Sequence, residues 1–191
     1  MKKNGVFLMS WDEYQSIKRK LVLDPDVFVG EADGTLIHDK MSFCRTILFA
    51  MGGSETDMAR VGGFESFSDV MSDMEWFKAD EWNMTGKPGQ YCLAILNQEM
   101  IEAESQEQYN IYSDVLCGLV YDWTQGREHY GNIGACRDFT VFLVDSRDNP
   151  PDPSAVLYSW LPPEYGTADF PWQDEVGSRY NESDPQSVGE G

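Results

Sequence analysis

The sequence predicts an α/β domain built on a small three-stranded parallel sheet. Three apolar runs are predicted to be strands, at residues 27–29, 91–96 and 139–144, and the continuous run at 91–96 is typical of a strand covered on both faces. Amphipathic segments separate these runs, and strands that alternate with helices favour right-handed crossovers and a parallel sheet. With 191 residues, of which 41% are hydrophobic, the chain can bury a core. We therefore expect one α/β domain at residues 25–147, with extensions at both ends.

Residues 1–24 are expected to form an N-terminal appendage. They begin with a short apolar run, and Ser10 and Glu13 then have the spacing of a capping box, which predicts a helix from this point. Asp24-Pro25 ends that helix. The segment has no apolar run as long as a signal peptide or a membrane span.

The elements of the core are expected in a regular order. The strand at 27–29 leads to a turn, and Asp39 can cap a helix that Gly52-Gly53 ends. A second helix starts near Phe64. The later elements are a strand at 91–96, a helix at 107–123 and a strand at 139–144.

The composition changes after Ser146. Seven of the nine prolines follow this residue. Residues 148–173 keep several aromatic and aliphatic side chains, and we expect them to fold back onto the domain as an irregular lash. Residues 174–191 are polar and acidic, which is typical of a disordered tail.

The net charge of −19 is distributed unevenly along the chain. Residues 1–20 carry five Lys or Arg against two Asp or Glu, whereas the rest carries nine against thirty-one. Such a chain repels phosphate backbones, which argues against direct nucleic-acid binding. It attracts basic proteins and accelerates their encounter. The four cysteines have no C-x-x-C spacing, so we expect a reduced, cytoplasmic protein.

The sequence offers few groups for catalysis or metal binding. Only two histidines are present, and neither has the spacing of a metal motif. A small enzyme that uses Cys117 with His129 is one alternative, and a cation site at Asp57, Asp69 and Asp73 is another. We favour neither, and we expect no catalytic residues, metal or cofactor.

The segment 64–77 predicts a helix with two different faces. One face is apolar and suited to burial, with Phe64, Phe67, Val70, Met71 and Met74. The other carries Glu65, Ser68, Asp69, Ser72, Asp73 and Trp76. Like charges four residues apart cost a helix about 0.2–0.5 kcal/mol per pair, and no Lys or Arg lies between Arg60 and Lys78. Two interpretations stay open, a solvated acidic face and a surface kept for a cationic partner.

Residues 26–146 resemble the barstar-like family. Residues 27–43, with Ala-Asp-Gly-Thr-Leu-Ile-His-Asp-Lys at 32–40 in their centre, look like the family's opening strand, turn and first helix. The motifs at 65–69 and 73–77 are similar to its second-helix signature. The resemblance implies the family's fold and an intracellular inhibitor of a guanyl-specific ribonuclease, or an immunity protein against a related toxin. In that family, carboxylates of the second helix take the place of RNA phosphates.

Carried over by position, Glu65 and Asp69 match the acidic contact positions, and Asp69 is the central one. Gly62 and Gly63 lie in the loop that would enter the partner's active site. The predicted partner-binding residues are Gly62, Gly63, Glu65, Ser68, Asp69, Ser72, Asp73 and Trp76. The expected complex joins one monomer to one basic ribonuclease or nuclease toxin, without nucleic acid or membrane. The alternative is an acidic adaptor or nucleic-acid-mimic decoy that binds another basic protein.

Overall fold

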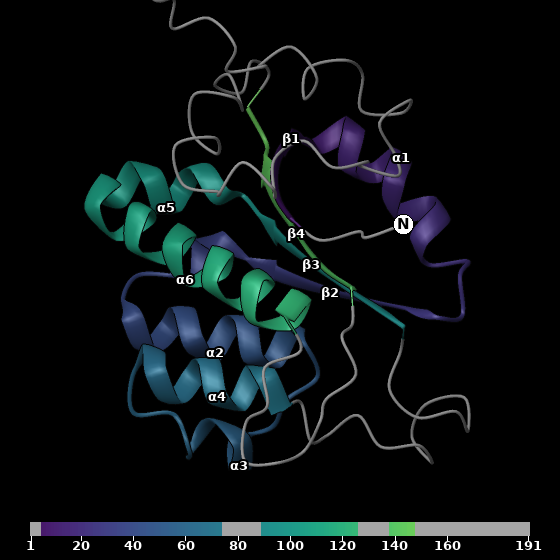
Figure 1. The fold of residues 1–191 in the computed structure, drawn as a ribbon. Coiled ribbons are helices and arrows are strands. Elements are labelled where there is room, and N and C mark those ends of the chain that lie inside the picture. Colours follow the sequence, from purple (N-terminus) through teal and green to yellow (C-terminus); the bar gives the residue numbers. More distant parts are fainter. Residues whose placement is uncertain (1–4, 74–88, 126–137, 148–191) are drawn as a thin grey trace, which may run out of the picture.

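A computed structural model of the chain describes residues 5–73, 89–125 and 138–147. It shows a mixed α/β fold in which helices pack against a parallel sheet of four strands (Figure 1). The spatial order is β1-β4-β3-β2. The strands are β1 (Gly5–Ser10), β2 (Val27–Asp33), β3 (Gln90–Leu96) and β4 (Asp138–Asp145). The α/β class and the parallel sheet are confirmed, but the expected number of three strands is wrong.

The fourth strand comes from the N-terminal segment. Residues Gly5–Ser10 pair in parallel with β4, and Phe7 lies opposite Phe142. The interpretation of residues 1–24 as an appendage is therefore wrong, because β1 and the helix after it belong to the sheet and its core. A pattern within this segment could not show that its partner strand lies more than a hundred residues away.

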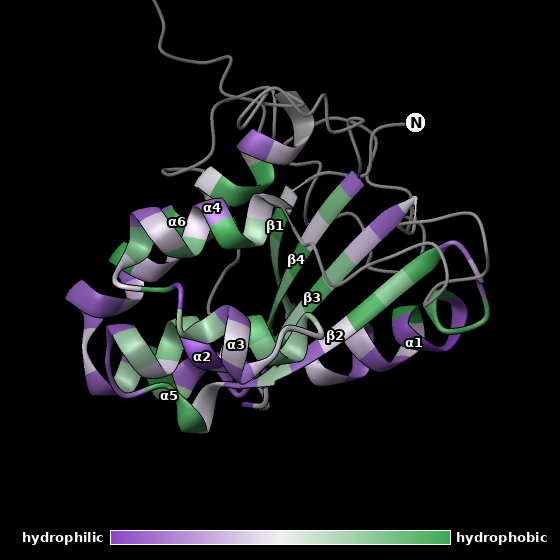
Figure 2. Ribbon diagram, turned by 90° about the horizontal axis from the view of Figure 1, so that it is seen from below, coloured by the Kyte–Doolittle hydropathy of each residue, from purple (hydrophilic) through white to green (hydrophobic). Residues whose placement is uncertain are grey.

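The helices lie on both faces of the sheet. Their bounds are α1 (Trp11–Leu21), α2 (Lys40–Ala50), α3 (Glu55–Met58), α4 (Phe64–Asp73), α5 (Gln98–Glu104) and α6 (Gln106–Gln125), with a short 3₁₀ turn at Gly34–Leu36. Helix α1 covers one face, and α2, α4 and α6 lie on the other (Figures 1 and 2). Polar and apolar residues alternate around these helices, as expected for helices with one buried face (Figure 2).

Each face of the sheet has its own hydrophobic core. Under α1, the residues Tyr14, Ile17 and Leu21 pack with alternate residues of the strands, and the Tyr14 ring lies 6.0 Å from that of Phe142. The larger core lies under α2, α4 and α6. Burying one large apolar side chain contributes about 1.5–3 kcal/mol, so these two cores account for most of the stabilisation.

Three of the predicted helix boundaries are confirmed, whereas α1 ends at Leu21, before the expected stop at Asp24-Pro25. Ser10 and Glu13 form the expected capping box at the start of α1. Asp39 caps α2 through the backbone N–H of Ser42, at 2.7 Å. Gly52, just after α2, has a φ of 86°, a left-handed conformation that favours glycine. The lash at 148–173 and the tail at 174–191 lie outside the described residues.

Candidate functional site

The candidate site is built on α4, the helix predicted to carry the acidic surface. Its apolar side is buried as expected: Phe67 and Met71 are fully inaccessible and Val70 nearly so. Phe64 is partly buried against the same core, and Met74 lies outside the described residues. The rings of Phe64 and Phe67 both contact Phe43 of α2 edge-on. These contacts fix which side of α4 faces outward.

The outward side carries the two predicted carboxylates, one helical turn apart. Glu65 is exposed, whereas Ser68 and Asp69 are half-buried. Asp69 also interacts with another part of the protein. The two acidic residues are therefore not equivalent, and Glu65 is the more accessible of the pair. The resemblance to barstar-like proteins implies instead that Asp69 holds the central position.

Gly62 and Gly63 form the turn that starts α4. Their backbone N–H groups donate to Ser66 Oγ at 2.8 and 3.1 Å, so Ser66 caps the helix from inside its first turn. A Cβ atom at Gly62 would lie 3.9 Å from Ser66 Oγ, which is ordinary contact. The turn is thus held by the hydroxyl of Ser66 rather than by any need for glycine, and its two amides are already satisfied.

A basic side chain lies beside this turn. Lys40 Nζ is 5.7 Å from the centroid of the Phe64 ring, a cation–π distance. It would also lie 3.5 Å from a Cβ atom at Gly63. The start of α4 therefore combines the acidic Glu65 with one positive charge from α2.

The last three predicted contact residues have different outcomes. Ser72 lies on the polar side of the helical wheel, yet its hydroxyl oxygen is buried and has no hydrogen-bond partner among the described residues. As a residue Ser72 is half-buried, like Ser68 and Asp69, and its role in partner binding stays a prediction. Asp73 is the last residue of α4, and Trp76 lies outside the described residues.

No family model, curated protein or solved structure matches this chain. The resemblance to barstar-like proteins therefore stays a prediction that rests on short motifs.

A second polar cluster, which the sequence reasoning missed, lies where β4 ends. Asp145 is fully buried and accepts a hydrogen bond from Gln98 Nε2 at 2.9 Å. Its carboxylate also pairs with the guanidinium of Arg147. Burial alone would raise the pKa of Asp145, but the hydrogen bonds from Arg147 and Gln98 hold it below its ordinary value.

This cluster also ties the end of β4 to α5. Glu99 of α5 accepts from the backbone N–H of Ser146 at 3.2 Å and from its hydroxyl. Arg147 reaches Glu102 of α5 at 3.2 Å. The sequence signal that could have indicated this cluster is the run of polar residues Asp145, Ser146 and Arg147 directly after the apolar part of β4. Gln98 Nε2, Arg147 and Ser146 donate to the carboxylates of this cluster, whereas the buried Gln98 Oε1 has no partner among the described residues. Because these contacts join α5 to the end of β4, we assign the cluster to holding the two elements together.

Two of the groups considered for catalysis or metal binding, Asp57 and Cys117, are held by local hydrogen bonds or by burial. Asp57 accepts hydrogen bonds from Ser54 at the start of α3, and these lower its pKa. Burial raises the pKa of Cys117 to about 12, and His129 lies outside the described residues. Within 5–73, 89–125 and 138–147, no three His, Cys, Asp or Glu side chains are grouped to hold a metal ion. None of the helices described there has the length and hydropathy of a membrane span.

Proposed function

We propose that this protein is a stoichiometric inhibitor that blocks the basic active site of a ribonuclease-type toxin with acidic residues of α4. The observation that carries the proposal is the exposed Glu65, one turn from Asp69, on a helix whose other side buries Phe67, Val70 and Met71 in the core. A ribonuclease active site gathers cationic side chains for phosphate. Carboxylates held on a fixed helix offer similar charge without a bond that can be cleaved.

The charge of the whole chain supports the same partner. The net charge of −19 favours encounter with a basic protein through long-range attraction. Added salt screens this attraction over about 10 Å at 0.1 M, so association should slow as salt rises. The motif resemblance to barstar-like inhibitors, which use the corresponding helix, is the second support.

The packing of α4 bears on affinity. Binding loses less entropy when the contact groups are ordered in advance. Phe64, in the first turn of α4, packs against Phe43 of α2 and Tyr112 of α6, and these two rings stack on each other. Carboxylates on a helix supported in this way can act as a preformed surface, so we expect little change in α4 when the partner binds.

Inhibition assays on a panel of purified basic guanyl-specific bacterial ribonucleases test the proposal. We expect the full chain to stop cleavage of a fluorescent RNA by a member of the panel at one inhibitor per enzyme. The double variant Glu65→Gln and Asp69→Asn keeps side-chain shape and removes both charges. It should weaken inhibition by about thirtyfold or more, because a central charged contact is commonly worth about 2 kcal/mol.

The matched control is Asp12→Asn. Asp12 is exposed in the first turn of α1, on the opposite face of the sheet, and the change removes a charge of the same kind. We expect it to slow association slightly and to leave the dissociation rate unchanged. Equal inhibition by the wild type and the α4 double variant would show that α4 is not the binding surface.

A further inference from the structure

Strand β2 forms an edge of the sheet in the part of the chain that the structure describes. It pairs with β3 on one side only, over the seven residues Val27–Asp33. About half of the backbone N–H and C=O groups of an edge strand point away from the sheet and can pair with another extended chain. This edge is therefore a surface on which an added strand can form main-chain hydrogen bonds.

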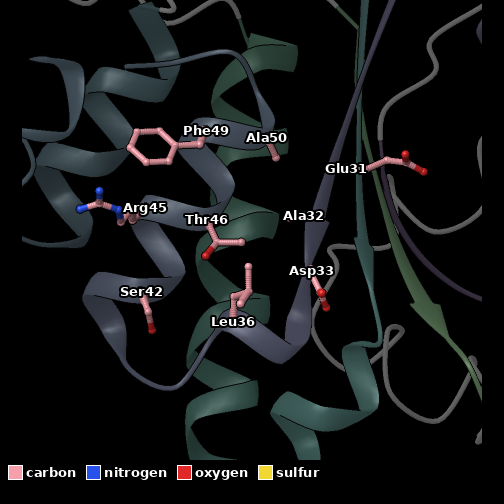
Figure 3. A pocket seen from close by; sticks show the side chains of 9 residues that line it. All are labelled: Glu31, Ala32, Asp33, Leu36, Ser42, Arg45, Thr46, Phe49 and Ala50. Atoms are coloured by element: carbon pink, nitrogen blue, oxygen red, sulfur yellow. The ribbon is translucent and has the colours of Figure 1, made fainter. Parts of the chain in front are cut away.

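A cleft lies between the end of this strand and α2. It has a volume of about 540 Å³, and its lining includes Thr46 and Phe49 of α2, Ala32 of β2 and Leu36 of the 3₁₀ turn. In Figure 3, Thr46 lies on the side of α2 that faces β2, whereas the Phe49 ring projects from the other side of the helix. Leu36 is 59% exposed and Phe49 36% exposed. Since both are apolar, the cleft suits an apolar side chain of a bound segment.

The two walls of the cleft are held in place. A Cβ atom at Gly30 would lie 2.3 Å from the carbonyl oxygen of Ala50, so the end of α2 packs directly on the backbone of β2. On the other face of the sheet, Glu31 accepts from Tyr14 Oη at 2.7 Å and from Lys18 Nζ at 2.8 Å. The strand is thus fixed from both faces before anything binds.

The charges around the edge select the partner. Among the described residues, two basic side chains near this edge are paired, Lys18 with Glu31 and Arg45 with Glu55. Three carboxylates near β2 accept only uncharged donors in the described contacts. Before the strand, Asp24 accepts from the backbone N–H of Asp26, and Asp26 accepts from that of Gly89. At the end of the strand, Asp33 accepts from the backbone N–H of Thr35 and from the side-chain amide of Asn97. The edge therefore carries an excess of negative charge.

We propose that the β2 edge and the adjoining cleft bind an extended basic segment of a partner protein as an added strand, with one aliphatic side chain in the cleft. Main-chain hydrogen bonds provide affinity in this mode of recognition, and alternate side chains provide specificity. Because successive side chains of a strand point to opposite faces, one set faces α2 and the cleft while the other faces the side of α1.

Charge also argues against two other occupants of the edge, the C-terminal residues 148–191 of this chain and a second copy of the chain. Residues 148–191 contain nine Asp or Glu against one Arg, and they include seven prolines, which cannot donate to a sheet. A second copy of the chain brings its own net charge of −19. A basic segment from another protein is the occupant that the acidic edge attracts.

This surface is separate from the one proposed on α4. Helix α2 packs against β2 and also against α4, so it lies between the two surfaces. The inference does not depend on the inhibitor proposal, and either can fail alone.

The test uses the full chain and a fluorescent peptide of about seven residues that alternates lysine with leucine, matching the length of β2. We expect saturable binding that weakens with salt, together with slower hydrogen exchange at β2 backbone amides. A peptide with glutamate in place of lysine should not bind. A peptide with proline at its central positions should bind at least about tenfold more weakly, because it lacks N–H donors.

Variants locate the site. Thr46→Trp fills the cleft and should weaken the lysine–leucine peptide about tenfold, and Leu36→Asn, at an exposed position, should do the same without a change of charge or of the core. Ile111→Trp is the matched control, because Ile111 is 42% exposed on α6. Circular dichroism checks that each variant is folded.

Several results would overturn the proposal. One is equal binding of the peptide to the wild type and to both cleft variants, which would indicate attraction by charge alone. Another is exchange protection on α4 in place of β2. A third is slow hydrogen exchange at the outward-facing β2 amides without peptide, because the edge would then already be covered. Sedimentation would show whether the chain covers it as a monomer or as a dimer.

Discussion

The ring of Phe43 stacks on the ring of Tyr112, with centroids 4.4 Å apart and planes 13° from parallel. This pair joins α2 to α6, and Phe64 of α4 meets both rings edge-on, at 6.0 and 6.1 Å. An isolated helix of ten residues is marginal in water. The orientation of α4, and of the carboxylates on it, therefore depends on these aromatic contacts.

Replacing Phe43 with Ala should destabilise the protein by about 3–5 kcal/mol, because the side chain is fully buried and the change leaves a cavity. Phe49→Ala on the same helix is the matched control. Phe49 is 36% exposed, so its loss should cost less than about 1 kcal/mol. Urea denaturation followed by tryptophan fluorescence measures both. Similar costs for the two variants would contradict the packing described for Phe43.

Gly30 and Gly118 predict opposite effects of the same substitution. Gly30→Ala should destabilise by about 1–3 kcal/mol, because the new methyl group would lie 2.3 Å from the carbonyl oxygen of Ala50. Gly118→Ala should stabilise by about 0.5–1 kcal/mol, since Gly118 lies inside α6 and nothing is within 4 Å of the added atom. Thermal unfolding of the two variants distinguishes them, and a stable Gly30→Ala protein would argue against direct packing of α2 on β2.

Ser66→Ala should cost about 1 kcal/mol, because the Ser66 hydroxyl accepts from the amides of Gly62 and Gly63. Hydrogen exchange of these two amides should become faster while exchange in β3 and β4 stays slow. Ser16→Ala, at an exposed position of α1, serves as the control and should have no measurable effect. Unchanged exchange at Gly62 and Gly63 would mean that another group holds the turn.

Asp145 predicts a loss of stability in acid. The pKa of its carboxyl in the folded protein lies below the ordinary 3.8, although burial opposes this, because Arg147 and Gln98 donate to the charged form. A depressed pKa contributes stability above the unfolded-state value, and this contribution is lost as pH falls through the folded-state value. The free energy of unfolding should therefore decrease from about pH 5 downward.

Asp145→Asn isolates this contribution. Asp33, Asp39 and Asp57 also have lowered pKa values, caused mainly by hydrogen bonds from Asn97, Ser42 and Ser54 respectively, so acid should weaken the wild type through several groups. The variant should be about 1–3 kcal/mol less stable at pH 7 and less sensitive to pH below 5. Parallel pH profiles for variant and wild type would show that Asp145 is not charged in the folded protein.

Burial predicts slow alkylation of two cysteines. It raises the pKa of Cys44 to about 11 and that of Cys117 to about 12, so few molecules carry the reactive thiolate at pH 8. Iodoacetamide should modify both at least about a hundredfold more slowly in the native protein than in urea. Mass spectrometry of the digested protein reports each site separately. Rapid native modification of Cys117 would revive the alternative of a nucleophilic thiol.

Local patterns predicted the elements whose signals are local. The capping box at Ser10 and the glycine stop after α2 appeared as expected, and so did the buried side of α4. The position of β1 could not be predicted in the same way. Its apolar run is as consistent with a free segment as with a strand, because only pairing with β4 distinguishes the two.

The candidate site shows the same division. The spacing of Phe67, Val70 and Met71 predicted their burial and hence the outward side of α4. Sequence spacing could not show that the hydroxyl of Ser72 is covered or that Asp69 is half-buried, since both depend on packing with other segments. The ion pair between Asp145 and Arg147 was not predicted, because the chain has 33 Asp and Glu residues and nothing in the sequence distinguishes Asp145 from the others.

The pairing of β1 with β4 has a consequence for synthesis. Gly5 finds its partner Thr140 only after most of the chain has been translated. At about 5–20 residues per second, the apolar side of α1 stays without its complete sheet for roughly ten seconds on the ribosome. We therefore expect chaperones that shield nascent chains to contact α1 before β4 has been synthesised and can complete the sheet that covers its apolar side.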